Sequence, residues 1–137
     1  MFTFSSKAVY GLTAVAELAL HAGQPAIQIG EIARIHGIPQ HYLEQILVQL
    51  KKAGLVESFR GAQGGYRLAR RPGEILVRDV LGHLDGELSV VGDNHRGGML
   101  QFYWLQLESS IRGLLDVTLE ELLLRKQQAE GQLSYII

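Results

Sequence analysis

Residues 38–70 read IPQHYLEQILVQLKKAGLVESFRGAQGGYRLAR, and the rest of the chain is organised around them. Pro39 suits the first turn of a helix, because the N–H that proline lacks would have no partner there. The apolar residues that follow recur at i, i+3, i+4 and i+7 and form one stripe: Leu43, Ile46, Leu47 and Leu50. Gly54 comes after the last turn, where glycine commonly ends a helix. The first half of this stretch therefore predicts an amphipathic helix.

The second half predicts a β-hairpin. Two short runs of strand-forming residues, Leu55–Phe59 and Tyr66–Leu68, flank a glycine-rich loop. Four arginines surround this loop: Arg60, Arg67, Arg70 and Arg71. A polar helix beside an arginine-flanked hairpin is typical of a winged helix-turn-helix, whose helix enters the DNA major groove while the hairpin reaches the backbone or minor groove. The alternative is a structural helix and hairpin with a solvated charged rim.

The residues before this stretch predict two further helices. Ser5 or Ser6 can cap a helix to about His21, whose inner stripe is Val9, Leu12, Ala16 and Ala19, widened by Val15 and Leu20. Residues 31–36 predict a short helix that stops at Gly37, so that a tight turn joins it to the polar helix as in a helix-turn-helix unit. Two short runs, Ala26–Ile29 and Ile75–Val77, predict a small edge strand and a third wing strand.

The composition favours one compact domain with an interaction element. Of the 137 residues, 47% are hydrophobic, which is ample for a core. The net charge of −1 conceals an asymmetry between the two halves of the chain. Residues 1–78 hold nine Lys and Arg and five acidic residues, whereas residues 79–137 hold four Lys and Arg and nine acidic residues. A basic first half favours a nucleic-acid face, although a difference of this size also arises by chance.

The second half of the chain is dominated by one apolar helix, predicted from Met99 to Leu115. Its main stripe is Leu100, Tyr103, Trp104, Leu107, Ile111 and Leu114, and further apolar residues lie off that stripe. A helix that is apolar on more than one side must be covered on both, so we expect it to mediate dimerisation. The alternative is a monomeric core helix packed under its own C-terminus. A capping-box pattern at residues 118–121 opens a final helix to about Gln128. These features divide the chain into residues 1–86, a DNA-binding domain, and residues 87–137, a linker with the dimerisation and C-terminal helices.

These residues resemble the Rrf-two family of bacterial transcriptional regulators. The resemblance covers most of the chain and is densest between Ser6 and Gly86. Its most specific parts are Tyr42-Leu43-Glu44-Gln45 in the polar helix and Arg60-Gly61-x-x-Gly64-Gly65-Tyr66 in the hairpin. It implies a mostly α fold with a small β-wing, a homodimer with two winged helix-turn-helix heads, and binding to imperfect inverted repeats in promoters.

The resemblance also implies roles for individual residues. The recognition helix would present Gln40, His41, Tyr42, Glu44 and Gln45, with Glu44 accepting from a cytosine amino group and Gln45 pairing with adenine. For His41, groove contact and simple solvation stay open. The wing would present Arg60, Gly61, Gln63, Gly64, Gly65 and Tyr66, with Arg60 in or near the minor groove. Phosphate contacts would come from Lys7, Tyr10, Lys51 and Lys52.

The chain departs from the family pattern at the wing. A third consecutive glycine is usual where this chain has Gln63. If that position needs a positive φ, the glutamine costs about 1 kcal/mol. Alternatively, the side chain supplies an extra polar contact.

The second departure concerns cofactors. Cluster-binding members carry three cysteines between the positions of Leu88 and Met99, whereas this chain has no cysteine at all. Disulfides, thiol catalysis and cysteine-ligated zinc or iron–sulfur clusters are therefore excluded, and we expect no cofactor and no metal. His95 lies near Asp93 and His83 in sequence, but the spacing matches no strong metal pattern and indicates a solvated or hydrogen-bonded histidine.

The sequence thus predicts a cytoplasmic DNA-binding transcriptional regulator, acting as a homodimeric repressor on double-stranded DNA. Three alternatives stay open for its signal: a small ligand, a protein partner, or no signal at all. The alternative is a protein-interaction module with vestigial DNA affinity. An enzyme is disfavoured, because Gly61–Gly65 is not followed by the Lys-Ser/Thr of a phosphate-binding loop and no H-E-x-x-H occurs. No segment predicts a signal peptide or a membrane span.

Overall fold

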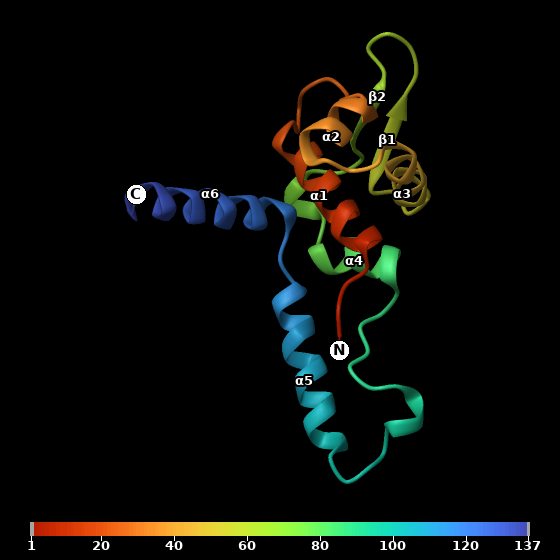
Figure 1. The fold of residues 1–137 in the computed structure, drawn as a ribbon, viewed down its shortest axis with the longest axis vertical. Helices are drawn as coiled ribbons and strands as arrows, with labels where there is room; N and C mark the ends of the chain where they lie inside the picture. Colours follow the sequence, from red (N-terminus) through yellow and green to blue (C-terminus); the bar gives the residue numbers. More distant parts are fainter. Residues whose placement is uncertain (1, 137) are drawn as a thin grey trace.

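The computed structural model describes residues 2–136, with side chains for residues 2–132. It is mostly α-helical with one two-stranded antiparallel sheet, as expected. The elements in chain order are α1 (Ser6–Leu20), α2 (Ile29–His36), α3 (Gln40–Lys52), β1 (Val56–Phe59), β2 (Gly65–Leu68), η1 (Pro72–Glu74), α4 (Val77–Asp85), η2 (Asp93–His95), α5 (Gln101–Leu115) and α6 (Leu119–Ile136). Helices α1 to α4 and the hairpin gather in one head, α5 extends away from it, and α6 points sideways (Figure 1).

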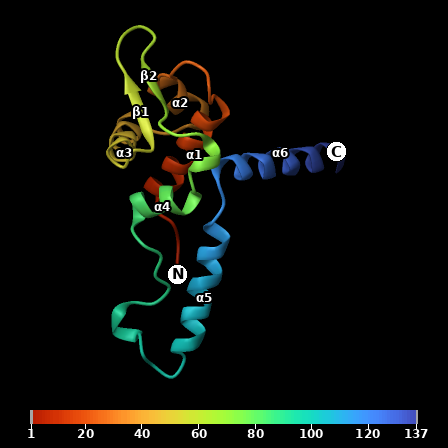
Figure 2. The ribbon, with the colours of Figure 1, turned by 180° about the vertical axis from the view of Figure 1, so that it is seen from behind.

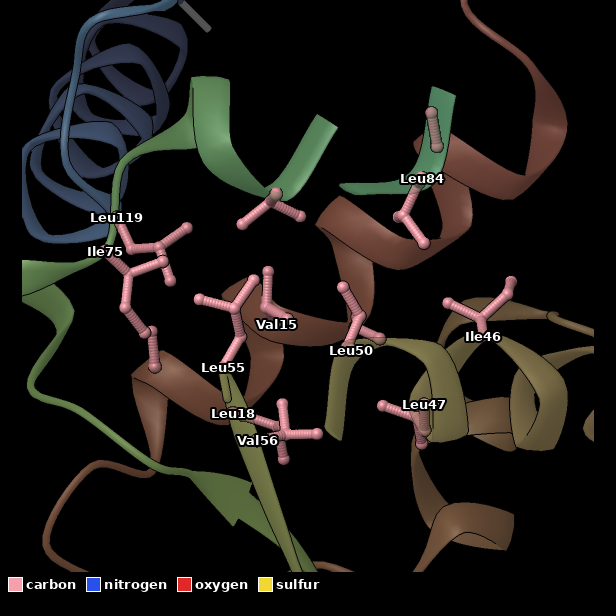
Figure 3. Packing of buried hydrophobic residues seen from close by; sticks show 14 of the residues in the cluster. Val15, Leu18, Ile46, Leu47, Leu50, Leu55, Val56, Ile75, Leu84 and Leu119 are labelled. Atoms are coloured by element: carbon pink, nitrogen blue, oxygen red, sulfur yellow. The ribbon is translucent and has the colours of Figure 1, made fainter. Parts of the chain in front are cut away.

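The predicted stripe of the polar helix forms the centre of the head. Its four members, Leu43, Ile46, Leu47 and Leu50, are fully buried. They pack with apolar residues from α1, β1 and α4 (Figure 3), including Val15, Leu18, Val56 and Leu84. Helix α3 therefore presents one face to the core and its polar faces to solvent. Gly54 follows α3 at a φ of +77°, in the left-handed region that glycine adopts without strain.

The buried face of α1 differs from the predicted one. Val15 and Ala19 are buried as predicted, but Val9 and Leu20 are 51% and 53% exposed, and the core receives Ala8 and Gly11 instead. The reason is a close approach to α4, because a Cβ on Gly11 would lie 2.2 Å from Leu84 Cδ1. A glycine is therefore required where α1 crosses α4, and the face that it defines leaves Val9 and Leu20 toward solvent. The predicted stripe was wrong in this respect.

The predicted third wing strand was also wrong. Residues 75–77 pair with the segment between α5 and α6 instead of with the wing, through Val77 N–H to Val117 O (2.8 Å) and Leu119 N–H to Ile75 O (2.9 Å). Val117 and Leu119 are buried in the same core as α3. The chain therefore returns to the head after α5. The division at residue 86 stays a prediction.

The loop between α4 and α5 is attached to α5 by a buried carboxylate. Glu108 is 2% exposed and accepts from Val90 N–H (2.8 Å) and the Arg96 guanidinium (3.2 Å). Arg112 donates to Leu88 O (3.1 Å) one turn further along the helix. These contacts hold residues 88–96 along α5, whose N-terminal part extends away from the head in both views (Figures 1 and 2).

The C-terminal half corrects two predicted boundaries. Helix α5 begins at Gln101 instead of Met99, with Leu100 as its N-cap. Helix α6 continues to Ile136, well past Gln128. Among the described residues, no helix combines the length and apolar character needed to cross a bilayer.

Candidate nucleic-acid interface

The N-terminal turns of α3 present a polar, solvent-exposed face. Gln40, His41, Glu44 and Gln45 are all exposed. Tyr42 differs from them, because it is half-buried and its ring packs edge-to-face against Tyr10 of α1, with 5.8 Å between the ring centroids. Of the five predicted recognition residues, four therefore project outward, and the fifth braces the start of α3 against α1.

The exposed residues of α3 lie close enough to influence one another. His41 Nδ1 is 3.7 Å from the Glu44 carboxylate, and His41 Nε2 is 3.4 Å from Gln45 Nε2. Glu44 is the only acidic residue of α3. An imidazole, an amide and a carboxylate thus present donors and acceptors on adjacent positions of one helix face, the kind of set that reads base edges.

Two of the wing glycines are required by the surrounding backbone. A Cβ on Gly64 would lie 2.4 Å from Phe59 O, and one on Gly65 would lie 2.2 Å from Ile27 O. Gly65 also has a φ of +138°. In the described part of the chain only glycines have a positive φ, so Gln63 carries no such strain and is exposed at the wing tip. The wing therefore tolerates Gln63 where the family usually has glycine.

The wing is attached to the beginning of α2. Ile27 and Tyr66 exchange two backbone hydrogen bonds of 2.8 Å each, and Gln28 Nε2 donates to Ala62 O (3.3 Å). Sequence reasoning missed Ile27 and Gln28. The only signal was the extended run Ala26–Ile29, which gave no indication of its partner. Because α2 also precedes α3, these bonds link the hairpin to the helix-turn-helix unit, and α3 and β1 lie side by side (Figure 1).

The basic side chains of the head fall into two groups. Several are engaged with neighbours: Arg67 pairs with Glu57 (3.3 Å) and lies over the Phe59 ring, Arg71 pairs with Glu74, and Lys51 donates to Ser58 Oγ (2.6 Å). The Arg34 guanidinium hydrogen-bonds Glu31 and holds the pKa of that carboxyl below its usual value.

Other basic side chains have no such partner within the described residues. Arg60 and Lys52 are exposed and Lys7 is half-buried, and none of them forms an ion pair or side-chain hydrogen bond there. These three cations are therefore free to meet phosphates, whereas a phosphate contact from Lys51 would compete with Ser58.

The side chains considered for metal binding do not form a metal site. Within the described residues, no group of three or more His, Asp or Glu side chains has an arrangement that could hold a metal ion. Asp93 is 3.4 Å from the Arg96 guanidinium, and His95 is exposed in η2.

The predicted dimerisation residues lie along an uncovered face of α5. Leu100, Tyr103 and Leu114 are exposed, the last at 74%, while Trp104, Leu107 and Ile111 are half-buried. Phe102 and Leu105, which lie off the stripe, are also exposed. Helix α5 therefore exposes several large apolar side chains that the chain's own head and loop do not cover.

Comparison with known proteins agrees with this architecture. A family model described as an iron-dependent transcriptional regulator, Rrf2, matches residues 4–124. The regulator CymR of Bacillus subtilis is 36% identical over 121 residues, covering 86% of this chain and 87% of CymR. The regulator IscR of Aliivibrio salmonicida is 36% identical over 127 residues, covering 87% of this chain and 76% of IscR.

Solved structures give the same result. The structure of B. subtilis CymR, described as a global cysteine regulator, superposes with a TM-score of 0.80 at 35% identity, covering 89% of this chain and 96% of that one. T. potens IscR superposes with a TM-score of 0.80 at 38% identity, covering 93% and 90%. The chain therefore belongs to the Rrf2 (Rrf-two) family of helix-turn-helix transcriptional regulators.

Proposed function

We propose that the protein is a sequence-specific DNA-binding repressor that acts as a homodimer on inverted-repeat promoter sites. The observation that carries this proposal is that one core holds an exposed polar helix face beside an arginine-carrying hairpin. The exposed side chains of Gln40, His41, Glu44 and Gln45 lie on a helix beside a hairpin whose loop carries Arg60, which has no ion-pair partner within the described residues. Related proteins of this family are named HTH-type transcriptional regulators. Occupying a promoter excludes the polymerase, so repression is the simplest consequence.

In this proposal different exposed side chains contact different parts of the DNA. Glu44 and Gln45 contact base edges in the major groove, where a carboxylate selects a cytosine amino group and an amide selects adenine. Arg60 enters or borders the minor groove. Lys7 and Lys52 contact phosphates and so position the head without specifying sequence. Tyr10 and Tyr42 support α3 from behind, with their hydroxyls as further phosphate donors.

The homodimer follows from the apolar surface of α5. A second copy would bury the exposed side chains of Tyr103 and Leu114 and complete the cover of Leu107. Two heads on a two-fold axis read the two halves of an inverted repeat, because operator symmetry mirrors protein symmetry. No bound cofactor is needed for this arrangement.

The proposal is tested by fluorescence anisotropy on a pool of promoter duplexes from the source genome, at low and near-physiological salt. We expect the protein to bind a few duplexes tightly and to keep binding them at the higher salt. These duplexes should share an inverted repeat. Uniformly weak binding that is lost steeply with salt would reveal only the phosphate contribution. That outcome would favour a protein-interaction module instead.

Replacing Arg60 by alanine is expected to weaken binding to the selected operator about tenfold or more, since a lost arginine contact in a groove costs about 1–3 kcal/mol. Folding and dimerisation should not change, because Arg60 is exposed and touches no partner within the described chain. The matched control is Arg125→Ala, which removes the same charge from an ion pair on α6. Equal operator affinities for the Arg60 and Arg125 variants would show that the wing arginine does not contribute to DNA binding.

A further inference from the structure

Helix α1 carries a charged side chain that the proposed function does not use. Glu17 is 7% exposed and lies beside Leu18 in the buried face of α1. Burying a carboxylate is costly unless hydrogen-bond donors surround it. Among the described residues, only Glu17 and Glu108 are charged and buried.

Two histidines supply the donors. His36 Nε2 is 2.8 Å from Glu17 Oε1, and His21 Nδ1 is 3.1 Å from Glu17 Oε2. His21 Nδ1 is also 2.9 Å from the backbone oxygen of Glu17. Both contacts require a proton on the named ring nitrogen, since carboxylate and carbonyl oxygens only accept. Each carboxylate oxygen therefore serves a different imidazole.

The two histidines differ in what they connect. His21 is the C-cap of α1, so its contact with Glu17 stays within one helix terminus. His36 is the last residue of α2 and is followed by Gly37 in the left-handed region, at a φ of +64°. After Gly37, Ile38 is buried and α3 begins at Gln40. The Glu17–His36 contact therefore ties α1 to the turn that leads into α3.

Helix α2 is short and contributes few side chains to the core, so polar contacts at its two ends add to its attachment. It has eight residues and buries only Ile32 and Ala33. Its beginning is held by the paired hydrogen bonds between Ile27 and Tyr66 of the wing. Its end is held by His36 on Glu17. The two polar attachments thus set the direction of α2 and, through the turn, the placement of α3.

We propose that Glu17 is a positioning residue for the recognition helix, acting through His36. The proposal deepens the DNA-binding function and rests on it. The carboxylate supplies a separate acceptor oxygen to each imidazole, and an alanine at this position would remove both acceptors. Without the Glu17–His36 bond, the end of α2 is free to shift and the first turn of α3 moves relative to the wing.

The test compares the two histidines, which share one carboxylate. His36→Ala and Glu17→Ala are expected to lower operator affinity about tenfold, because either change removes the bond that holds the end of α2. His21→Ala, the matched control, should stay within about twofold. His36→Gln should recover most of the affinity, because the glutamine amide can donate to the same oxygen. Circular dichroism should show that all four variants are folded.

A second measurement is independent of DNA. In ¹⁵N-labelled free protein, His36→Ala should shift the amide resonances of residues 40–45 more than His21→Ala does, and wild-type His36 should show a protonated Nε2. Equal shifts, or equal losses of affinity for the two alanine variants, would overturn the positioning role. If wild type shows no specific DNA binding, the proposed function fails and these resonances alone decide the role of Glu17.

Discussion

Replacing Leu107 by glutamate is expected to convert the protein to monomers and to lower its affinity for an inverted-repeat operator about 100-fold. Leu107 lies at the centre of the apolar stripe on α5, and a carboxylate there would be buried without a partner in a dimer. The affinity falls because two linked heads bind one repeat far more tightly than two separate heads do. Light scattering and operator titration measure the two effects.

A second substitution separates association from folding. Leu114 is 74% exposed in the single chain, so Leu114→Glu cannot disturb the fold of one subunit but should weaken the dimer as Leu107→Glu does. Gln106→Glu, on an exposed polar position of the same helix, is the matched control and should remain dimeric. If both leucine variants scatter as dimers, α5 is not the interface.

Replacing Gly65 by alanine is expected to destabilise the head by about 2–4 kcal/mol and to abolish tight operator binding. The added Cβ would lie 2.2 Å from Ile27 O and 2.4 Å from Ile27 C, which are backbone atoms that cannot turn aside. The clash forces apart the strand pairing of Ile27 and Tyr66, with its two hydrogen bonds of 2.8 Å. The wing then loses its attachment to α2. Urea unfolding at constant pH gives the change in unfolding free energy.

The matched control for Gly65 is Gly61 in the same loop. Gly61 has a φ of +99°, but a Cβ there would meet nothing within 4 Å. Gly61→Ala should therefore cost only the backbone strain of about 1–2 kcal/mol. Equal destabilisation by the two variants would show that strain, and not the contact with Ile27, makes glycine necessary at position 65.

The elements that the sequence predicts correctly are those specified by local patterns. The spacing of Leu43, Ile46, Leu47 and Leu50 determines which face of α3 is buried, because a helix repeats every 3.6 residues whatever surrounds it. The hairpin follows from its glycine-rich loop between two extended runs. The exposure of Gln40, His41, Glu44 and Gln45 follows from the same periodicity. The DNA-facing residues could therefore be named without coordinates, although their contacts remain predictions.

What local patterns could not decide were the pairings between distant segments. The buried face of α1 depends on how closely α4 approaches Gly11, and residues 75–77 pair with a segment some forty residues further along the chain. The attachment of the wing to Ile27 and the burial of Glu17 between two histidines are of the same kind. By itself the sequence determined that these helices and the hairpin form and which side chains of α3 are exposed, because these depend on neighbours in the chain. The tertiary structure alone decided how α2 and α3 are held in place, because that depends on side chains and backbone brought together by packing.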